Sequence, residues 1–208
     1  MNIKKLLGYA LGPIGGAAAS AVALPLISWY FPADDIGRIV LLQTVSSLVL
    51  IVLGLGLDQA YIREYHAADN RAGLLKAVLV LPLAFIAAAV LLVGVFDRAW
   101  PSEIILELNS ASVGLLCLIF MATMLLSRYL SVVLRMQERA YAFSFSQLTP
   151  KILILVIVLT YMLTGAAKST FNLIFAYTLA QILTTLVLLL QTKSELARAW
   201  RAPFDRAV

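Results

Sequence analysis

An all-α membrane protein built as a six-helix transmembrane bundle is the fold class that this sequence predicts. Of the 208 residues, 62% are apolar and only 13% are charged, whereas soluble domains are about 45–50% apolar and about 25% charged. The apolar residues form continuous runs, unlike the alternating strands of an outer-membrane barrel. The single cysteine, Cys117, cannot form an internal disulfide. Composition therefore excludes a soluble domain, a disordered chain and a disulfide scaffold.

Six apolar segments are each long enough to cross a bilayer, which takes about 20 helical residues. They cover approximately residues 6–31, 39–61, 74–96, 110–134, 140–163 and 171–191. Turn and charge signals separate them, for example at residues 32–35 and 97–102. Residues 1–191 are thus predicted to form one six-helix lobe. Residues 192–208 form a basic tail, in which Leu196, Ala199 and Trp200 share one face of a short helix lying on the membrane surface.

Lysine and arginine residues are distributed unequally between the two ends of this predicted bundle. With a cytoplasmic N-terminus, only Arg38, Arg98 and Lys168 of the 16 lysine and arginine residues lie in outer loops. Positive residues favour the cytoplasmic side, so both termini are predicted to be cytoplasmic. This topology and contact with anionic phospholipid headgroups explain the net charge of +5 without a nucleic-acid partner.

The motifs of common enzymes are missing from the sequence. It has no phosphate loop, no H-E-x-x-H and no G-x-S-x-G pattern. The single histidine, His66, has no neighbouring histidine or cysteine with which to bind a metal. We therefore expect a protein that is not an enzyme and that needs neither a cofactor nor a metal.

Two cations fall inside predicted spans. Lys151 lies about 16 Å into the fifth segment, near the bilayer midplane, where a lysine costs at least ~2.5 kcal/mol. We expect it to face a wet cavity, towards which Pro150 would open the helix backbone. Alternatively, the span starts later and Lys151 is an interfacial anchor. The side chain of Arg128 either faces the same cavity or extends to the lipid headgroups. Two inward cations would suit an anionic, phosphate-bearing substrate.

Other polar residues complete the set of candidates. Gln43 and Ser47 belong to a polar stripe on the second segment, which forms interhelical hydrogen bonds or lines the cavity. Arg63 is a further candidate for contact with substrate. Asp58 lies near the cytoplasmic end of the same segment, with the apolar Ile62 at the i+4 position where a partner would be expected.

The first segment carries small residues at every fourth position. Gly8, Gly12, Gly16 and Ser20 form a ridge that allows another helix to approach closely. Pro13 and Pro25 can each bend this helix.

Several stretches resemble the oligosaccharide flippases of the multidrug/oligosaccharidyl-lipid/polysaccharide exporter superfamily. The stretches are Leu11-Gly12-Pro13, residues 25–28 (Pro-Leu-Ile-Ser), residues 31–37 (Phe-Pro-Ala-Asp-Asp-Ile-Gly), residues 54–60 with 63–65, and residues 134–144. The resemblance implies that the structural motif positions are Gly12, Pro13, Pro25, Gly54, Asp58 and Pro150. It implies a fold of two six-helix lobes around a substrate cavity, of which this chain resembles the first.

The resemblance also implies a function and a location. The chain would flip a polyprenyl-pyrophosphate-linked oligosaccharide across the bacterial cytoplasmic (inner) membrane during O-antigen or related polysaccharide synthesis. It would work with a second lobe or a second copy, and with polysaccharide glycosyltransferases or a polymerase. Two alternatives stay open: a membrane scaffold of a polysaccharide-assembly complex that transports nothing, and a multidrug-type exporter of the same superfamily. An exporter of cationic drugs would need an acidic cavity.

Overall fold

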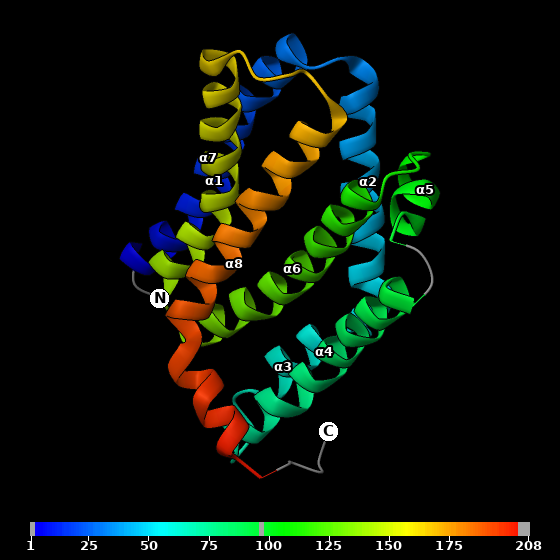
Figure 1. Ribbon diagram of the computed structural model, residues 1–208. Coiled ribbons are helices and arrows are strands. Elements are labelled where there is room, and N and C mark those ends of the chain that lie inside the picture. Colours follow the sequence, from blue (N-terminus) through cyan, green and yellow to red (C-terminus); the bar gives the residue numbers. More distant parts are fainter. Residues whose placement is uncertain (1–2, 96–97, 204–208) are drawn as a thin grey trace.

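The computed structural model describes residues 3–95 and 98–203, and within these ranges every regular element is an α-helix (Figure 1). The helices are α1 (Ile3–Tyr30), α2 (Ala33–Gly54), α3 (Leu57–Glu64), α4 (Arg71–Val95), α5 (Trp100–Leu106), α6 (Ala111–Met136), α7 (Ala140–Thr164) and α8 (Thr170–Arg201). All except the short α3 and α5 are long and apolar enough to cross a membrane. The all-α, multi-pass fold class is therefore confirmed.

The spanning helices alternate in direction and define two ends of the bundle. α1, α4 and α7 run one way, and α2, α6 and α8 run back (Figure 1). The end at which α1 begins and α8 finishes is here called the basic end. It carries Lys4, Lys5, Arg63, Arg71, Lys76, Arg135, Arg139, Lys193, Arg198 and Arg201. Most of the cations among the described residues therefore lie at one end of the bundle.

The opposite end is closed by polar contacts between loops and helix starts. Arg38 pairs with Asp35 at 3.5 Å and donates a hydrogen bond to Thr170 Oγ1 at 3.1 Å. The Thr170 hydroxyl in turn donates to Asp35. Tyr30 Oη donates to the carbonyl of Ala166 at 2.6 Å. These contacts tie the start of α2 to the start of α8, and the end of α1 to the loop after α7.

α8 and α6 form the centre of the bundle. Leu130 and Leu134 of α6 are fully buried against Leu188 of α8. Leu173 and Ile174, in the first turns of α8, are fully buried in the core at the opposite end. α8 packs in addition on α4 and α7. The buried face of α8, which combines apolar residues with threonines, thus contacts α2, α4, α6 and α7.

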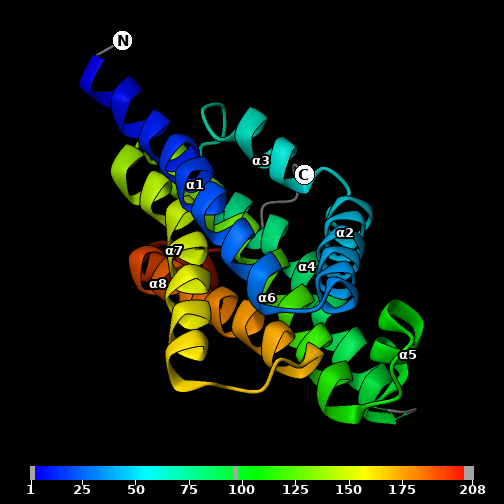
Figure 2. The ribbon, with the colours of Figure 1, turned by 90° about the horizontal axis from the view of Figure 1, so that it is seen from above.

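α1 lies beside α7, parallel to it, and away from α2 for most of its length (Figures 1 and 2). The glycine ridge makes this contact: a Cβ atom on Gly8 would lie 3.0 Å from Ala140 Cβ, and one on Gly12 would lie 2.7 Å from Ser144 Cα. Ser144 Oγ donates a hydrogen bond to the carbonyl of Gly8. Pro13 and Pro25 lie inside α1, which continues through both.

The expected continuous helix over residues 39–61 is wrong. α2 begins earlier, at Ala33, because Asp34 and Asp35 favour the positive N-terminal end of a helix. It ends at Gly54, and α3 starts at Leu57 after two residues in the left-handed region, Leu55 (φ 47°) and Gly56 (φ 72°). Glycine adopts this conformation without steric cost, so Gly56 makes the break possible.

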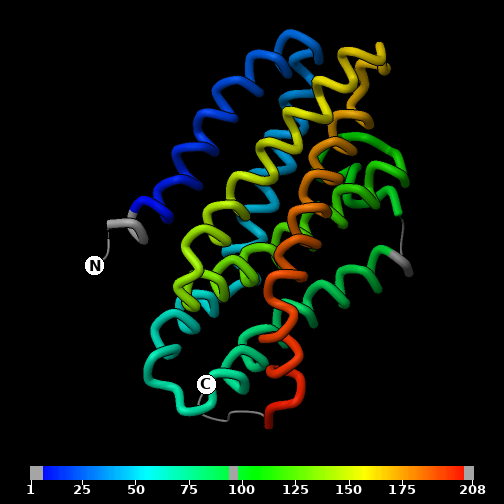
Figure 3. The backbone as a smooth tube through the Cα atoms, turned by 90° about the vertical axis from the view of Figure 1, so that its left-hand side faces the viewer, coloured from blue at the N-terminus to red at the C-terminus, as the bar shows by residue number. Residues whose placement is uncertain are grey.

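The basic tail also differs from expectation. Instead of forming a separate surface helix, residues 192–201 continue α8 past the start of α4 (Figure 3). Ala199 is buried, and Lys76 Nζ donates a hydrogen bond to the carbonyl of Ala202 at 3.1 Å. Trp200 remains exposed. Residues 204–208, the last part of the predicted tail, lie outside the described residues.

Replacement of Gly12 by alanine tests the α1–α7 contact. The added methyl group would meet the backbone of Ser144 at 2.7 Å, and overpacking of this kind costs about 1–3 kcal/mol. We expect the free energy of unfolding, measured by denaturant titration in mixed micelles, to fall by this amount. The matched control is Gly16→Ala, whose nearest contact would be at 3.9 Å. Equal stability of the two variants would refute the proposed packing.

Candidate functional site

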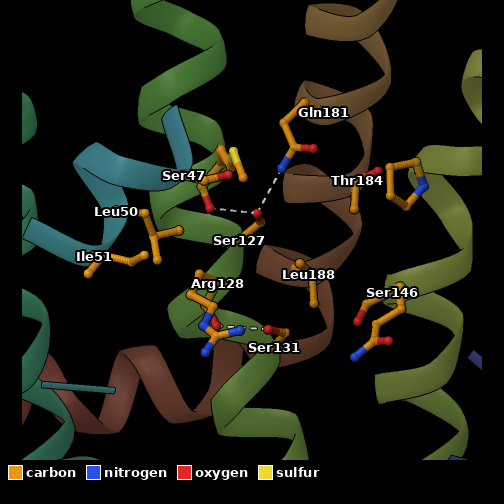
Figure 4. A pocket seen from close by; sticks show the side chains of 13 residues that line it. Ser47, Leu50, Ile51, Ser127, Arg128, Ser131, Ser146, Gln181, Thr184 and Leu188 are labelled. Atoms are coloured by element: carbon orange, nitrogen blue, oxygen red, sulfur yellow. Dashed lines mark hydrogen bonds between the residues drawn. The ribbon is translucent and has the colours of Figure 1, made fainter. Parts of the chain in front are cut away.

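A pocket of about 530 Å³ with both polar and apolar lining residues opens between α2, α6, α7 and α8 (Figure 4). We call it the central pocket. It is lined by Ser47, Leu50, Ile51, Met124, Ser127, Arg128, Ser131, Ser146, Gln147, Pro150, Gln181, Thr184 and Leu188. All four contributing helices are long and apolar enough to cross a membrane.

Helical periodicity places these side chains together. On α6, Ser127 and Ser131 are four residues apart and flank Arg128, so all three project from adjoining faces of the helix. On α8, Gln181 and Thr184 are three residues apart and point to the same side. Each helix thus contributes a short polar stripe within an otherwise apolar segment.

Hydrogen bonds fix the polar side chains of the central pocket. Gln181 Nε2 donates to Ser127 Oγ at 2.8 Å, and Ser127 Oγ donates to the carbonyl of Met124 at 2.9 Å. Ser131 Oγ donates to the carbonyl of Arg128 at 2.8 Å. Because these hydroxyl protons are already engaged, the oxygens retain lone pairs with which to accept hydrogen bonds. The pocket therefore suits a ligand rich in hydroxyl groups.

Arg128 is the one charged side chain among the lining residues, and it has a partner. Its Nη2 and Nε atoms lie 2.9 Å and 3.2 Å from Asp58 Oδ2, on α3. The arginine side chain is 48% exposed, whereas that of Asp58 is 14% exposed. Arg128 therefore remains partly exposed to the pocket, while the carboxylate of Asp58 balances its charge. The sequence contained both residues but did not predict this pairing.

The break between α2 and α3 positions Asp58. Tyr129 Oη donates to the carbonyl of Gly54 at 3.3 Å, and a Cβ atom on Gly54 would lie 3.4 Å from that hydroxyl oxygen. α6 thus holds the end of α2 at this point. The chain then changes direction through Leu55 and Gly56, which brings Asp58 of α3 to the guanidinium group of Arg128, the residue before Tyr129 on α6.

Pro150 lies inside α7 and lines the central pocket. Proline has no N–H group, so the carbonyl of Ser146, four residues earlier, loses its usual helical donor. Ser146 also lines the pocket. This pair adds a backbone acceptor to the wall formed by α7.

Lys151, in contrast, is not among the residues that line the central pocket. It is exposed on α7, and within residues 3–95 and 98–203 no hydrogen bond or ion pair to its side chain is found. Its neighbour Pro150 occupies the pocket side of the helix. The two intramembrane cations therefore differ in place: Arg128 is among the residues that line the central pocket, and Lys151 is not.

The remaining candidates are also distributed over several places. Ser47 lines the pocket. Gln43 is half-buried one turn away and contacts Tyr177. Arg63 is exposed on α3 and pairs with Glu64 at 2.8 Å, outside the pocket. Sequence reasoning missed Ser127, Ser131, Ser146, Gln181 and Thr184. The available signal was the presence of small polar residues at helical spacing inside apolar runs.

A smaller polar pocket of about 370 Å³ lies at the basic end. Arg198 and Glu195, both in its wall, form an ion pair at 3.2 Å. Burial raises the pKa of Tyr61 in the same wall, with the nearby Tyr65 and Glu195 adding to the effect. Tyr61 is therefore neutral at physiological pH and acts there as a packing residue.

No group of three or more potential metal-binding side chains occurs in the described part of the chain. Comparison with protein-family models, curated proteins and solved structures found no match. The argument about function consequently rests on the geometry of the central pocket.

Cysteine labelling tests whether water reaches the central pocket. In a Cys117→Ala background, Ser47→Cys places a thiol in the pocket wall, whereas Leu48→Cys places one on the 56% exposed apolar face of the same helix. In open membrane fragments we expect a charged, water-soluble thiol reagent to modify the variant at position 47 much faster. The reason is that lipid surrounds position 48. Equal rates would show that the pocket is dry.

Proposed function

We propose that this protein is a membrane transporter of the flippase type. Its substrate would be a polyprenyl-pyrophosphate-linked oligosaccharide, moved across the bacterial cytoplasmic membrane for O-antigen or related polysaccharide synthesis. The observation that carries the proposal is the central pocket, which combines hydroxyl and amide groups with one arginine at membrane depth. The resemblance of several sequence stretches to oligosaccharide flippases supports the same function.

Arg128 is the proposed binding group for the pyrophosphate. An arginine binds phosphate oxygens through two parallel N–H donors, and its attraction to an anion is stronger in the membrane interior than in water. In the structure Nε and Nη2 both face one oxygen of Asp58. A pyrophosphate would take over these donors in place of the carboxylate, while the serine, threonine and glutamine side chains accept hydrogen bonds from the sugar.

The charge of the central pocket separates this proposal from an exporter of cationic drugs. An acidic cavity would suit such a substrate, but no carboxylate is found among the lining residues. A scaffold without transport activity is the other alternative. It would bind polysaccharide glycosyltransferases or a polymerase and would show no translocation in liposomes.

A second lobe or a second copy of the chain completes the proposed transporter. The pocket is formed by one lobe and is open on one side, so a further six-helix unit would enclose the substrate. By analogy with the resembling family, the two units would rock to expose the pocket to each side of the membrane in turn.

Substitution of Arg128 tests the proposed phosphate contact. Hydrogen bonds to a charged group contribute about 1.5–3 kcal/mol, so Arg128→Gln should weaken binding of polyprenyl pyrophosphate by about tenfold to a hundredfold. Asp58→Asn removes the competing carboxylate and should bind at least as tightly as wild type. Binding would be measured with purified protein in detergent, after size-exclusion chromatography has shown that each variant is folded.

Arg63→Gln is the matched control, because Arg63 is exposed at the basic end and lies outside the pocket. It should bind like wild type. If Arg128→Gln and Arg63→Gln bound the pyrophosphate equally well, Arg128 would have no role in substrate binding.

We further propose that both termini face the cytoplasm, because the basic end holds most of the cations. A green fluorescent protein fused after residue 208 should therefore fluoresce in bacterial cells, and alkaline phosphatase fused there should be inactive. The reverse pattern would show that the bundle is inserted the other way round.

A further inference from the structure

An apolar groove of about 620 Å³ runs between α1, α7 and α8 near the basic end. We call it the α1–α7 groove. Its lining consists of Leu11, Ile14, Gly15, Tyr141, Ala142, Ser144, Phe145, Leu148 and Gln191. The residues that α7 contributes to this groove and to the central pocket differ, so the two hollows lie on different faces of α7.

The shape of the α1–α7 groove suits a hydrocarbon chain. Close packing at Gly8 and Gly12 holds the two helices together. A Cβ atom on Gly15 would lie 3.1 Å from Leu148 Cδ1, so the missing side chain at Gly15 leaves room for Leu148 in the groove wall. From Tyr141 to Leu148 the groove extends about 10 Å along the helix, within the ~15 Å thickness of one leaflet's hydrocarbon. The flanking Ile14 and Phe145 are exposed, so the groove is open to lipid.

Cations lie near the mouth of the α1–α7 groove. Arg139 Nη1 donates to the carbonyl of Gln191, a residue of the groove wall, at 2.8 Å. The carbonyl of Arg135 accepts a hydrogen bond from Tyr9 Oη of α1 at 3.3 Å, and the arginine is itself exposed. Exposed Lys193 follows Gln191 by two residues, and Glu138 is the nearby acid. The mouth therefore carries excess positive charge.

Two further residues mark the mouth as a membrane interface. Tyr141 is 65% exposed at the start of α7, and exposed tyrosines are enriched at the level of the lipid headgroups. The side-chain oxygen of Gln191 is buried and lacks a hydrogen-bond donor within the described residues. A ligand that carries a hydroxyl group beside its phosphate would supply such a donor.

We propose that the α1–α7 groove binds one acyl chain of an anionic phospholipid from the leaflet at the basic end. The phosphate of the headgroup contacts Arg139 and Arg135, and a glycerol headgroup provides the hydroxyl. Phosphatidylglycerol has this chemistry. The site does not depend on the proposed transport function, because it uses a different face of α7 and different residues.

Lipid retention measures this site directly. The purified protein would be equilibrated in detergent micelles with equal amounts of phosphatidylglycerol and phosphatidylcholine, and the lipids that stay bound would be quantified by mass spectrometry. We expect wild type to be enriched in phosphatidylglycerol. Arg139→Gln should reduce the enrichment about fivefold, the equivalent of the ~1 kcal/mol that one basic residue contributes near anionic lipid. Gly15→Leu should reduce total retained phospholipid by filling the groove.

Each variant has a matched control. Arg98→Gln removes the same charge at the opposite end, where Arg98 is exposed, and Ala17→Leu enlarges an exposed position of α1 outside the groove. Both should retain phosphatidylglycerol like wild type. Equal retention of the two lipids by wild type would overturn the proposal. The proposal would also be overturned if the Arg139→Gln and Gly15→Leu proteins retained as much lipid as their control variants.

Discussion

The ion pair between Arg128 and Asp58 is the interaction on which the central pocket depends. An arginine at the centre of a membrane helix costs about 2.5–3.5 kcal/mol on insertion scales, and a carboxylate at 2.9 Å offsets part of this cost. The carboxylate reaches that position because the helix breaks and the chain changes direction at Leu55 and Gly56. The break between α2 and α3 therefore places Asp58 where it can stabilise the charge of Arg128 in the pocket wall.

α7 separates two environments of opposite character. One face presents Ser146, Gln147 and Pro150 to the central pocket, and another presents Phe145 and Leu148 to the apolar groove. α1 can sit against α7 closely because glycines leave its contact side without side chains. α7 therefore presents a polar face to the central pocket and an apolar face to the α1–α7 groove.

Much of the fold follows from the sequence because length and apolar content alone mark the spanning helices. The break at Leu55 does not follow, since Gly54-Leu55-Gly56 lies in an apolar run and glycines are tolerated within membrane helices. The continuation of α8 to Arg201 was hidden by its charged residues, which resemble a surface tail. The pairing of Arg128 with Asp58 joins residues 70 positions apart, and Ser127 meets Gln181 in the same way. Such contacts are set by tertiary packing, which local patterns do not encode.

The position of Lys151 limits how a second unit can complete the proposed transporter. The lysine is exposed near the middle of α7, and among the described residues it has no counter-charge. A second copy that packed symmetrically over this face would bring another lysine towards the first, and like charges repel most strongly where the dielectric constant is low. A face of this kind favours a covering surface that carries acidic groups, or a water-filled space that holds an anionic substrate. Within the proposed function, a distinct second lobe meets this electrostatic requirement more readily than an identical copy.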